Sequence, residues 1–521
     1  MKKKYFTYIC ILVALLLVGS VFASAEEGLS VNDGSSLLTK NLEEIFAVGA
    51  HGTQPLFPGD IYALTGSGLQ ILGAAVNGGG GGLRYEDGVV EIGSESVKVG
   101  LAYSFSSSRD SSVSSSALLN VDGGGFSIGI YDEDGLFQTL AETESDAITV
   151  YPAPDCAVDV YVSGEQAPVC TVESTSKDSY LVIRPEPYDE EPLVRCAGID
   201  YYGEFAYAVL ANDRLTVVNI VDLEYYVMGV CAIEMSESWP VEALKAQAVA
   251  ARTFVQRMIG NSVYSYICGF DVTADTYTQA YRGTRGVGEN IRTAVLETRN
   301  QYLTHDGELI DALYSSSDGG ATEDSRNITG YQNAALRGVL DPYEASAEDE
   351  NPYASWRVTM TPSQLGNKLG IGKVREVTPT YSETGNTIKL EFVSNSGETA
   401  TLIRDNCRTG LGLKSIRYEI TRDDDGNFVF NGSGFGHALG MSQWGAYSMA
   451  KYHEKDYRFI LGFYYTDVGL SSGELPEVVE EEPSPETDEA APDPQEPSES
   501  EDAIPEELAE ETPTDPHEDA E

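Results

Sequence analysis

The sequence predicts an α+β protein with mixed, mainly antiparallel sheets and packed helices, preceded by a smaller β-rich domain. Three observations support this prediction. Short runs between residues 97 and 183 alternate apolar with polar or small residues, which is the period of half-buried strands. Residues 222–257 instead repeat apolar residues at steps of three and four, the period of helices. Residues 185–192 are rich in proline and acidic residues, which is typical of a linker between domains. We therefore expect sheets with helices packed on one side.

The first 25 residues resemble a secretory leader in a chain of 521 residues, which is long enough for two or three domains. Three lysines precede an apolar run over residues 5–22, and Ala23-Ser24-Ala25 forms a small-x-small cleavage site. We predict a signal peptide over residues 1–25, cut after Ala25. The alternative is an uncleaved anchor, since the run is just long enough to span a bilayer. Either way the protein is expected outside the cytoplasm, and it meets a membrane only if this segment is retained.

Charge and cysteine content exclude two classes of protein. The net charge of −50 repels polyanions, so we expect no nucleic-acid partner and no binding to anionic membrane. Six cysteines remain once Cys10 leaves with the leader, and none form a CxxC pair. The chain is therefore not a disulfide-dense scaffold. Cys156 and Cys170 either bridge a hairpin or are free buried thiols.

The remaining segments divide the chain further. Residues 26–95 are rich in Gly and Ser, including Gly78–Gly82, and predict short strands, loops and partial disorder. A β-rich N-terminal domain with its linker follows over residues 96–192. The main domain spans residues 193–470 and opens with two strands. Residues 471–521 hold 21 acidic residues, nine prolines and no Lys or Arg, so this tail is predicted to be disordered.

One carboxylate in the main domain stands where an apolar residue is expected. The first helix begins at the N-cap Asp222 and runs to about Met235. Its apolar face consists of Leu223, Tyr226, Val227, Val230 and, unexpectedly, Glu234. Because a carboxylate facing a core is costly when ionised, its pKa should rise until it holds a proton near neutral pH. That is what a general acid requires.

The second helix follows Pro240, which the first turn of a helix tolerates. It carries a core stripe with many alanines that permit close packing, formed by Leu244, Ala248, Ala251, Val255 and Met258.

Three blocks of residues resemble a known family. The first is Val221-Asp222-Leu223-Glu224-Tyr225-Tyr226-Val227-Met228-Gly229-Val230, followed by Glu234-Met235 and by Trp239-Pro240 through Arg252-Thr253. The second is Tyr314-Ser315-Ser316-Ser317-Asp318-Gly319-Gly320-Ala321-Thr322-Glu323, and the third is Gly434-Phe435-Gly436-His437 through Gly445-Ala446. In order and spacing they are similar to the signature of the stage II sporulation protein D / amidase enhancer (SpoIID/LytB) family. The resemblance covers about residues 200–470, so the SpoIID-like domain is expected there.

The resemblance implies action on bacterial cell-wall peptidoglycan, with the protein secreted or held in the cell wall at the outer face of the membrane. Sporulation members of the family are lytic transglycosylases that cleave the bond between N-acetylmuramic acid and N-acetylglucosamine in peptide-free glycan strands. The family's catalytic glutamate falls on Glu234. It first protonates the leaving oxygen, and its carboxylate then takes a proton from the muramoyl C6 hydroxyl, which closes a 1,6-anhydro ring. No water attacks, so the second carboxylate of an ordinary glycosidase is not required.

Two other functions stay open. The first alternative is a non-enzymatic protein, like the amidase-enhancer branch of the family, that binds wall glycan or stimulates an N-acetylmuramoyl-L-alanine amidase. A weaker alternative is a structural exoprotein that uses the β-rich region for adhesion. Glu234 on an apolar face favours the enzyme, because a modifier needs no protonated acid there.

Other residues of the blocks are candidates for substrate binding: Trp239, Tyr314, Ser317, Gly319, Gly320, His437 and Gln443. The two glycines let backbone approach a sugar, and the hydroxyls of Tyr314 and Ser317 can hydrogen-bond it. The alternative is a tight turn whose hydroxyls satisfy local backbone. Trp239 either stacks on a sugar ring or fills the helix junction. His437 either binds substrate or holds the glycine loop, and we favour the second role.

The chain departs from the family at one metal site. Some members bind zinc through a Cys and then a His-Cys pair, at positions that are Thr273, Tyr277 and Thr278 here. Cys268 alone cannot complete a tetrahedral site. We therefore predict no metal and no cofactor, and expect packing to hold this segment. The partners implied are glycan strands and a cell-wall amidase.

Overall fold

The computed structural model describes residues 61–65, 68–73 and 83–476, with gaps at 85, 87, 107–108, 114, 133, 175–178, 189–190 and 212–213. The predicted leader, the glycine run Gly78–Gly82 and the acidic tail beyond residue 476 lie outside these residues. The chain divides into the units Met1–Pro476 and Glu477–Glu521, and every described residue belongs to the first unit. Among the described residues, no helix combines the length and apolarity that crossing a bilayer needs.

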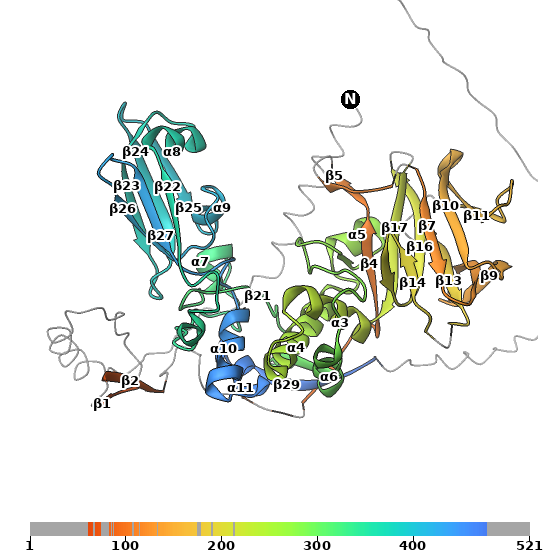
Figure 1. The fold of residues 1–521 in the computed structure, drawn as a ribbon, viewed down its shortest axis with the longest axis horizontal. Helices are drawn as coiled ribbons and strands as arrows, with labels where there is room; N and C mark the ends of the chain where they lie inside the picture. Colours follow the sequence, from red (N-terminus) through yellow and green to blue (C-terminus); the bar gives the residue numbers. More distant parts are fainter. Residues whose placement is uncertain are drawn as a thin grey trace, which may run out of the picture. The chain divides into compact units, whose positions relative to one another are not determined.

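Two antiparallel sheets make up the N-terminal part of the described chain (Figure 1). The larger has the order β18 (Val272–Thr273), β4 (Ser96–Ala102), β17 (Arg214–Asp222), β16 (Glu204–Ala211), β13 (Leu181–Glu186), β8 (Gly125–Tyr131) and β9 (Phe137–Thr143). The second has the order β12 (Cys170–Glu173), β11 (Ala157–Val162), β10 (Ala147–Ala153), β7 (Ala117–Val121), β14 (Val194–Cys196) and β15 (Ile199–Tyr201). Only the short β18 pairs in parallel within them, with β4. The predicted α+β class with mainly antiparallel sheets is confirmed.

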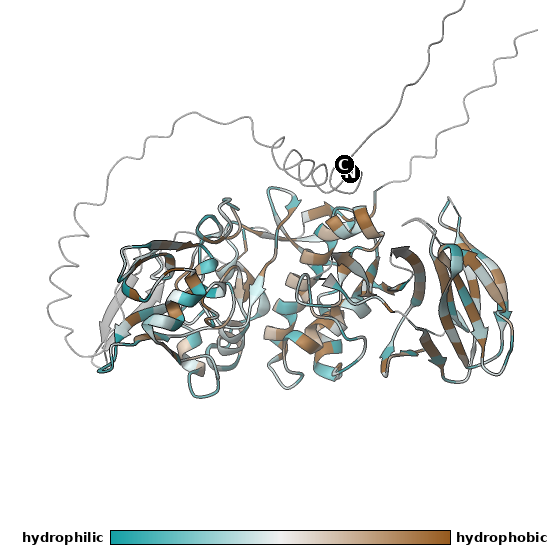
Figure 2. Ribbon diagram, turned by 90° about the horizontal axis from the view of Figure 1, so that it is seen from above, coloured by the Kyte–Doolittle hydropathy of each residue, from teal (hydrophilic) through white to brown (hydrophobic). Residues whose placement is uncertain are grey.

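Alternation of side chains buries one face of strands such as β4, whereas β8, β16 and β17 in the middle of the larger sheet are buried on both faces. Val97 and Val99 of β4 are fully buried, whereas Lys98 between them is exposed. Figure 2 shows the same alternation of apolar and polar residues along the strands. Strands from both sides of residue 192 share the two sheets, since β13 pairs with β16 and β7 pairs with β14. The apolar faces of both segments contribute to one core cluster. The division into a β-rich domain and a main domain stays a prediction.

Most helices of the main domain contribute to the same core as the larger sheet, whereas Tyr264 and Cys268 belong to a separate cluster with Val182, Ala206 and Val218. As predicted, the helix α3 (Leu223–Glu234) follows the N-cap Asp222, whose side chain accepts the backbone N–H groups of Glu224 and Tyr225. The others are α4 (Val241–Met258), α5 (Val263–Cys268), α6 (Glu289–Glu297), α10 (Gln443–His453) and α11 (Tyr457–Tyr464). Helix α4 contacts α3, α6, α10 and α11, and its predicted stripe is buried from Leu244 to Val255. The alanines of α4 allow these close approaches.

A separate apolar core lies within residues 356–430. It is enclosed by β22 (Trp356–Met360), β27 (Phe428–Gly432) and β26 (Tyr418–Arg422) in one sheet, and by β23 (Val374–Tyr381), β24 (Thr387–Ser394) and β25 (Thr399–Ile403) in another, with α8 (Pro362–Leu369) and α9 (Asn406–Thr409). We call this part the inserted lobe, because the chain enters it after β21 (Tyr314–Ser315) and leaves it before β28 (Met441–Ser442). These two short strands pair in parallel.

Smaller elements complete the described chain. A four-stranded sheet has the order β20 (Glu308–Leu309), β19 (Gln301–His305), β29 (Gly469–Glu474) and β3 (Gly88–Glu91). Two hairpins, one helix and two 3₁₀ turns remain: β1 (Ile61–Thr65) with β2 (Gly68–Gly73), β5 (Ser104–Ser106) with β6 (Arg109–Asp110), α7 (Ser325–Thr329), η1 (Pro154–Cys156) and η3 (Glu344–Ala347). Of the two alternatives for Cys156 and Cys170, the structure has free, half-buried thiols.

Candidate active site

Glu234 is the last residue of α3 and is half-buried. The other residues of its helical face, Leu223, Tyr226, Val227 and Val230, are at most 4% exposed. Burial raises the pKa of Glu234 above its ordinary value, as expected for a carboxyl on an apolar face. Hydrogen bonds from Gln443 and from the backbone of Ala280 act in the opposite direction, because they stabilise the carboxylate.

Gln443 connects Glu234 to two other helices. It is the first residue of α10, and its Nε2 donates to Oε2 of Glu234 at 3.1 Å and to Oε1 of Gln247 on α4 at 3.3 Å. Gln247 is fully buried, and its own Nε2 has no hydrogen-bond partner. Sequence reasoning named Gln443 but missed Gln247. The signal was present, because Gln247 lies three residues after Leu244 and four before Ala251, on the apolar stripe of α4.

Tyr314 lies near Glu234, but its hydroxyl is already engaged. The Tyr314 hydroxyl accepts from Nε2 of Gln279 at 2.9 Å, and Oε1 of Gln279 accepts from the Tyr226 hydroxyl at 3.1 Å. Burial, with the nearby negative charge of Glu234 as the next cause, raises the pKa of Tyr314 well above its ordinary value. The chain of Tyr226, Gln279 and Tyr314 thus forms a polar network beside the carboxyl group. Gln279 was missed, because no sequence pattern connects it to α3.

The serine-glycine loop after β21 uses its polar groups inside the protein. Ser317 is 1% exposed and its hydroxyl donates to Oε1 of Glu344 at 2.5 Å. Gly319 has φ +71°, and a Cβ there would lie 2.6 Å from the carbonyl carbon of Ser433. Gly320 has φ +113° and donates its N–H to Asp318. These contacts match the tight-turn alternative, and a role for the loop in binding substrate stays a prediction.

His437 also makes a local contact. Its Nδ1 accepts the backbone N–H of Leu439 at 3.0 Å. Burial lowers the pKa of His437 to about 4, so the ring is neutral at neutral pH. The contact is of the kind expected for the loop-holding role, and no contact joins His437 to Glu234 among the hydrogen bonds of the described residues.

Trp239 lies at the junction between α3 and α4, where it packs against aromatic residues of α10. Its ring centroid is 4.9 Å from that of Trp444 and 4.8 Å from that of Tyr447. Both Trp239 and Trp444 remain half-buried, so part of each ring faces solvent. Trp239 therefore fills the junction and also offers an apolar surface close to α3, so both predicted roles stay open.

The segment that binds zinc in some family members is held here by hydrogen bonds. The Thr273 hydroxyl donates to Asp275 at 2.8 Å, and the Thr278 hydroxyl donates to the carbonyl of Thr273 at 2.8 Å. Thr278 also accepts the backbone N–H of Thr273 at 3.0 Å. The expectation that packing alone holds this segment was incomplete, because hydroxyl groups at the corresponding positions link its two ends directly.

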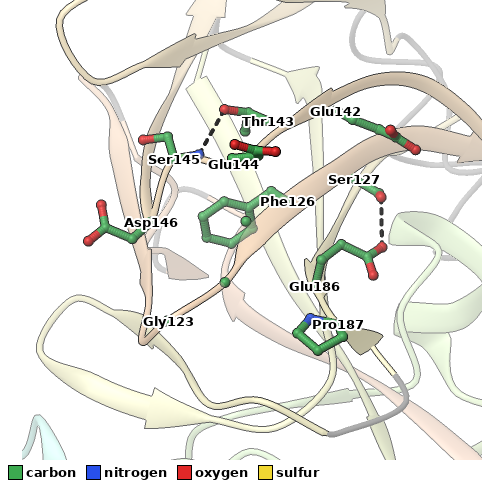
Figure 3. Close-up of a pocket in the computed structure, with 12 residues that line it drawn as sticks. Gly123, Phe126, Ser127, Glu142, Thr143, Glu144, Ser145, Asp146, Glu186 and Pro187 are labelled. Carbon is green, nitrogen blue, oxygen red and sulfur yellow. Dashed lines mark hydrogen bonds between the residues drawn. The ribbon is translucent and has the colours of Figure 1, made fainter.

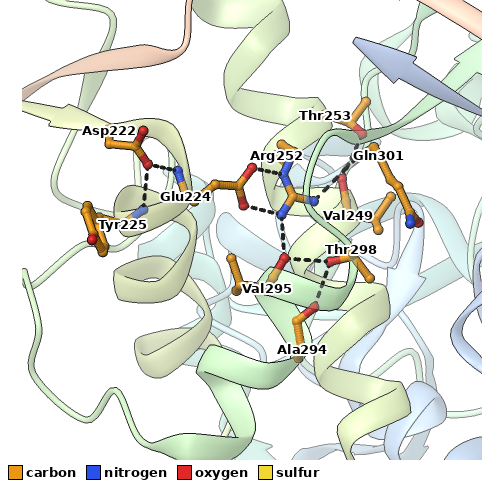
Figure 4. A network of polar contacts seen from close by, with 10 residues as sticks. All are labelled: Asp222, Glu224, Tyr225, Val249, Arg252, Thr253, Ala294, Val295, Thr298 and Gln301. Carbon is orange, nitrogen blue, oxygen red and sulfur yellow. Dashed lines mark hydrogen bonds and ion pairs between the residues drawn. The ribbon is translucent and has the colours of Figure 1, made fainter.

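A buried ion pair fixes α3 against α4 and α6 (Figure 4). Arg252 is fully buried, and its Nε donates to Oε1 of Glu224 at 2.9 Å while Nη2 contacts Oε2 at 2.5 Å. Nη2 also donates to the carbonyl oxygen of Val295 at 3.2 Å. This bidentate geometry matches the fork of a guanidinium to a carboxylate. The pair holds the helix that ends in Glu234, and an arginine directly after Ala250 and Ala251 on α4 was the sequence signal for it.

Two cavities lie elsewhere in the described chain. One of about 910 Å³ is lined by the turns at Gly123–Gly125 and Glu142–Asp146 and by Glu186 and Pro187 (Figure 3). The other, of about 1040 Å³, lies in the inserted lobe along β22, β26 and β27. Neither is lined by Glu234 or Gln443, so neither cavity bears on the chemistry of Glu234.

Comparison with known proteins agrees with the first of the three sequence blocks. Residues 211–305, which contain α3, α4 and Glu234, match the family model described as "Stage II sporulation protein". The chain is 31% identical to the stage II sporulation protein D of Bacillus subtilis, over 49% of this chain and 76% of that protein. It is 34% identical to an uncharacterized protein of Brachyspira hyodysenteriae, over 52% of this chain and 73% of that protein. It is also 27% identical to the amidase enhancer of Bacillus subtilis, over 56% of this chain and 47% of that protein. The chain therefore belongs to the stage II sporulation protein D family.

Proposed function

We propose that the chain is an extracytoplasmic lytic transglycosylase of peptidoglycan that acts in sporulation or cell-wall remodelling. It cleaves the bond between N-acetylmuramic acid and N-acetylglucosamine, and Glu234 serves as acid and then as base. The observation that carries the proposal is the environment of Glu234. Burial raises the pKa of this carboxyl group, while the Gln443 amide lies 3.1 Å from its Oε2. The name of the sporulation relatives supports a role connected with spore formation.

Both halves of the reaction use groups at this site. Protonated Glu234 gives its proton to the glycosidic oxygen, so the bond to the muramoyl C1 breaks and the leaving sugar gains a hydroxyl. The carboxylate left behind takes the proton of the muramoyl C6 hydroxyl, whose oxygen bonds C1 and closes the 1,6-anhydro ring. Glu234 ends protonated again, and no water is consumed. Desolvation favours the acid of the first step, and the amide of Gln443 with the N–H of Ala280 stabilises the carboxylate of the second.

The half-buried Trp239 and Trp444 support a glycan as the ligand. Their rings are partly exposed and lie at the end of α3, near the helix α10 that carries Gln443. Exposed aromatic faces suit the apolar faces of sugar rings. In this proposal Trp239 stacks on the glycan strand beside Glu234, and the glycines of the serine-glycine loop keep the neighbouring backbone compact.

The test is product analysis with full-length protein and peptide-free glycan strands. Mass spectrometry should find 1,6-anhydro-muramic ends with the parent and none with Glu234→Gln. The matched control is Glu289→Gln, which neutralises an exposed carboxylate at the start of α6 and should leave product formation unchanged. Glu234→Gln should melt at the same or a higher temperature, because it removes the cost of burying a charge. Normal product formation by Glu234→Gln contradicts the assignment of Glu234 as the catalytic acid and base.

The second candidate is a non-enzymatic enhancer of a cell-wall amidase, which the similarity to the amidase enhancer favours. The same preparation decides between them when an N-acetylmuramoyl-L-alanine amidase is added. A parent protein that forms no anhydro product but accelerates the amidase, equally well with Gln at position 234, supports the enhancer and contradicts the enzyme.

A further inference from the structure

Three buried carboxyl groups converge beneath the serine-glycine loop. Asp318 belongs to the loop itself, Asp341 follows it in the chain, and Glu344 begins the turn η3. They are 1%, 2% and 4% exposed, and one oxygen from each lies within 4.8 Å of the others. Like charges this close repel strongly in a medium of low dielectric constant, so something must offset them.

Hydrogen bonds from neighbouring groups satisfy the oxygens of two of the three carboxyl groups. Asp341 accepts the Tyr464 hydroxyl at 2.6 Å and two backbone N–H groups. The oxygens of Glu344 accept from both loops at the ends of the inserted lobe, and the donors are the hydroxyls of Ser317 and Ser442, the side-chain amide of Asn351 and the N–H groups of Asp318 and Gly319. Glu344 thus holds the serine-glycine loop in place through hydrogen bonds from Ser317, Asp318 and Gly319.

Asp318 is different, because no N–H or O–H donor of another residue reaches one of its oxygens. Oδ1 accepts the N–H of Gly320 at 2.7 Å, whereas Oδ2 is buried without a hydrogen-bond partner. Leaving a buried carboxylate oxygen without a donor is costly, and the side-chain neighbour within hydrogen-bonding reach of the Asp318 carboxyl is itself a carboxyl group, that of Glu344, with Asp341 close by. The cluster therefore lacks a positively charged or proton-donating group at Oδ2 of Asp318.

The charges of the surrounding residues do not supply that group. Arg417 is a half-buried cation that interacts electrostatically with Asp318 and Glu344, but it also faces Glu323. Its guanidinium donates to the carbonyl oxygen of Thr384 at 2.8 Å, away from the cluster. The three carboxyl groups of the cluster share this one guanidinium with Glu323, so the cluster has more acidic groups than nearby cations to offset them.

We propose that Asp318, Asp341 and Glu344 bind one Ca²⁺ ion. Carboxylate and hydroxyl oxygens are the ligands of hard cations, and the hydroxyl oxygen of Ser317, which accepts a hydrogen bond only from Asn351, keeps one lone pair for it. Ca²⁺ ligands lie about 2.3–2.6 Å from the ion, so opposite ligands are about 4.6–5.2 Å apart, whereas Mg²⁺ draws them to about 4.0–4.2 Å. The three oxygens all lie within 4.8 Å of one another, which is within the span of the ligands of one Ca²⁺ ion.

The ion would tie together the two loops that enter and leave the inserted lobe. Glu344 accepts the hydroxyl of Ser442, and that hydroxyl caps α10 by accepting the N–H of Gly445 at 3.2 Å. The residue after Ser442 is Gln443, whose side-chain amide contacts Glu234. Cation binding at Asp318 therefore stabilises the helix start that carries Gln443, although the cation itself touches none of the residues proposed for the reaction. This inference holds whether or not the chain is an enzyme.

Thermal unfolding of the full-length protein tests the proposal. Protein freed of metal with a chelator is heated in CaCl₂ or in MgCl₂, as the parent, as Asp318→Asn and as Asp424→Asn. The last is a control that neutralises an exposed aspartate on a turn of the inserted lobe. A ligand that binds only the folded state raises the melting temperature with its concentration. We expect Ca²⁺ to raise it by several degrees in the parent and in Asp424→Asn, more than Mg²⁺ does, and the rise to be absent from Asp318→Asn.

A second measurement keeps the test decisive if Asp318→Asn folds poorly. Terbium(III) replaces Ca²⁺ in such sites and is excited by a nearby aromatic ring, here Tyr464, which contacts Asp341. The parent should give terbium emission that excess Ca²⁺ displaces, with one tight site per chain. The acidic tail is common to every variant, so cation binding by the tail cancels in the comparison between them. A Ca²⁺-dependent rise retained by Asp318→Asn, or a parent without tight Tb³⁺ binding, overturns the proposal. A parent insensitive to Ca²⁺ with a more stable Asp318→Asn also overturns it, and shows a proton shared between Asp318 and Glu344.

Discussion

Replacing Arg252 with methionine should destabilise the protein strongly. Arg252 is fully buried and Glu224 is 8% exposed, so the substitution leaves a carboxylate inside the core without its bidentate partner. It also removes the donor to the Val295 carbonyl oxygen. Breaking a buried pair by removing one partner costs about 3–5 kcal/mol, most of it from the uncompensated charge. We therefore expect the free energy of unfolding to fall by about 3–5 kcal/mol in Arg252→Met.

The double variant Glu224→Leu with Arg252→Met separates the charge from the packing. Two apolar side chains of similar volume leave no unpaired charge, so this variant should recover most of the loss, with a coupling energy of at least about 2 kcal/mol. Urea unfolding can be followed by the fluorescence of Trp239 and Trp444, which pack beside these helices. The third tryptophan, Trp356, belongs to the core of the inserted lobe and reports a separate transition if the two parts unfold independently. A single variant that loses less than about 1 kcal/mol refutes the reasoning, because the pair is then not desolvated as the structure indicates.

Three further predictions concern the site and its loops. Gln443→Leu removes a donor that stabilises the carboxylate of Glu234, so Glu234 should keep its proton to a higher pH. The alkaline limb of the pH–rate profile for the anhydro product should therefore move to higher pH by about one pH unit, and an unchanged limb contradicts the contact. Since the pKa of His437 is about 4 when folded and about 6.5 when unfolded, its contribution to stability is complete above pH 6.5 and is lost as the pH falls towards 4. Urea unfolding across this range should show a shallower pH dependence in His437→Asn than in the parent. Gly440→Ala should cost at least about 3 kcal/mol, because its Cβ would lie 1.8 Å from the Leu313 carbonyl oxygen, whereas Gly426→Ala, with a similar φ and nothing within 4 Å, should cost only about 1 kcal/mol in the same assay.

Local elements were the most predictable part of the molecule. The helix α3 follows from the N-cap Asp222 and from an apolar face that repeats at steps of three and four, and both are properties of neighbouring residues. The burial of Glu234 follows from the same pattern. The family was also correctly identified, because its blocks are continuous in the sequence.

Contacts between distant segments were not predictable in the same way. Asp341 and Glu344 lie next to Asp318 in the folded chain, and no periodic pattern in the sequence relates this loop residue to them. Sheet pairing across the expected linker, such as β13 with β16, depends on which apolar faces meet in the folded chain rather than on the composition of residues 185–192. The network through Gln279 was missed for the same reason.

The parallel pairing of β21 with β28 has a consequence for how the site assembles during folding. Asp318 and Ser442, at or just beyond these strands, are separated by 124 positions, and the whole inserted lobe lies between them. Closing so long a loop carries an entropic cost, and the two paired residues of β21 and β28 do not offset that cost by themselves. The lobe, with its own apolar core, shortens this loop if it folds first. Gln443 would then reach Glu234 late in folding, so slow formation of the lobe should delay the appearance of a competent site well after α3 and α4 have formed.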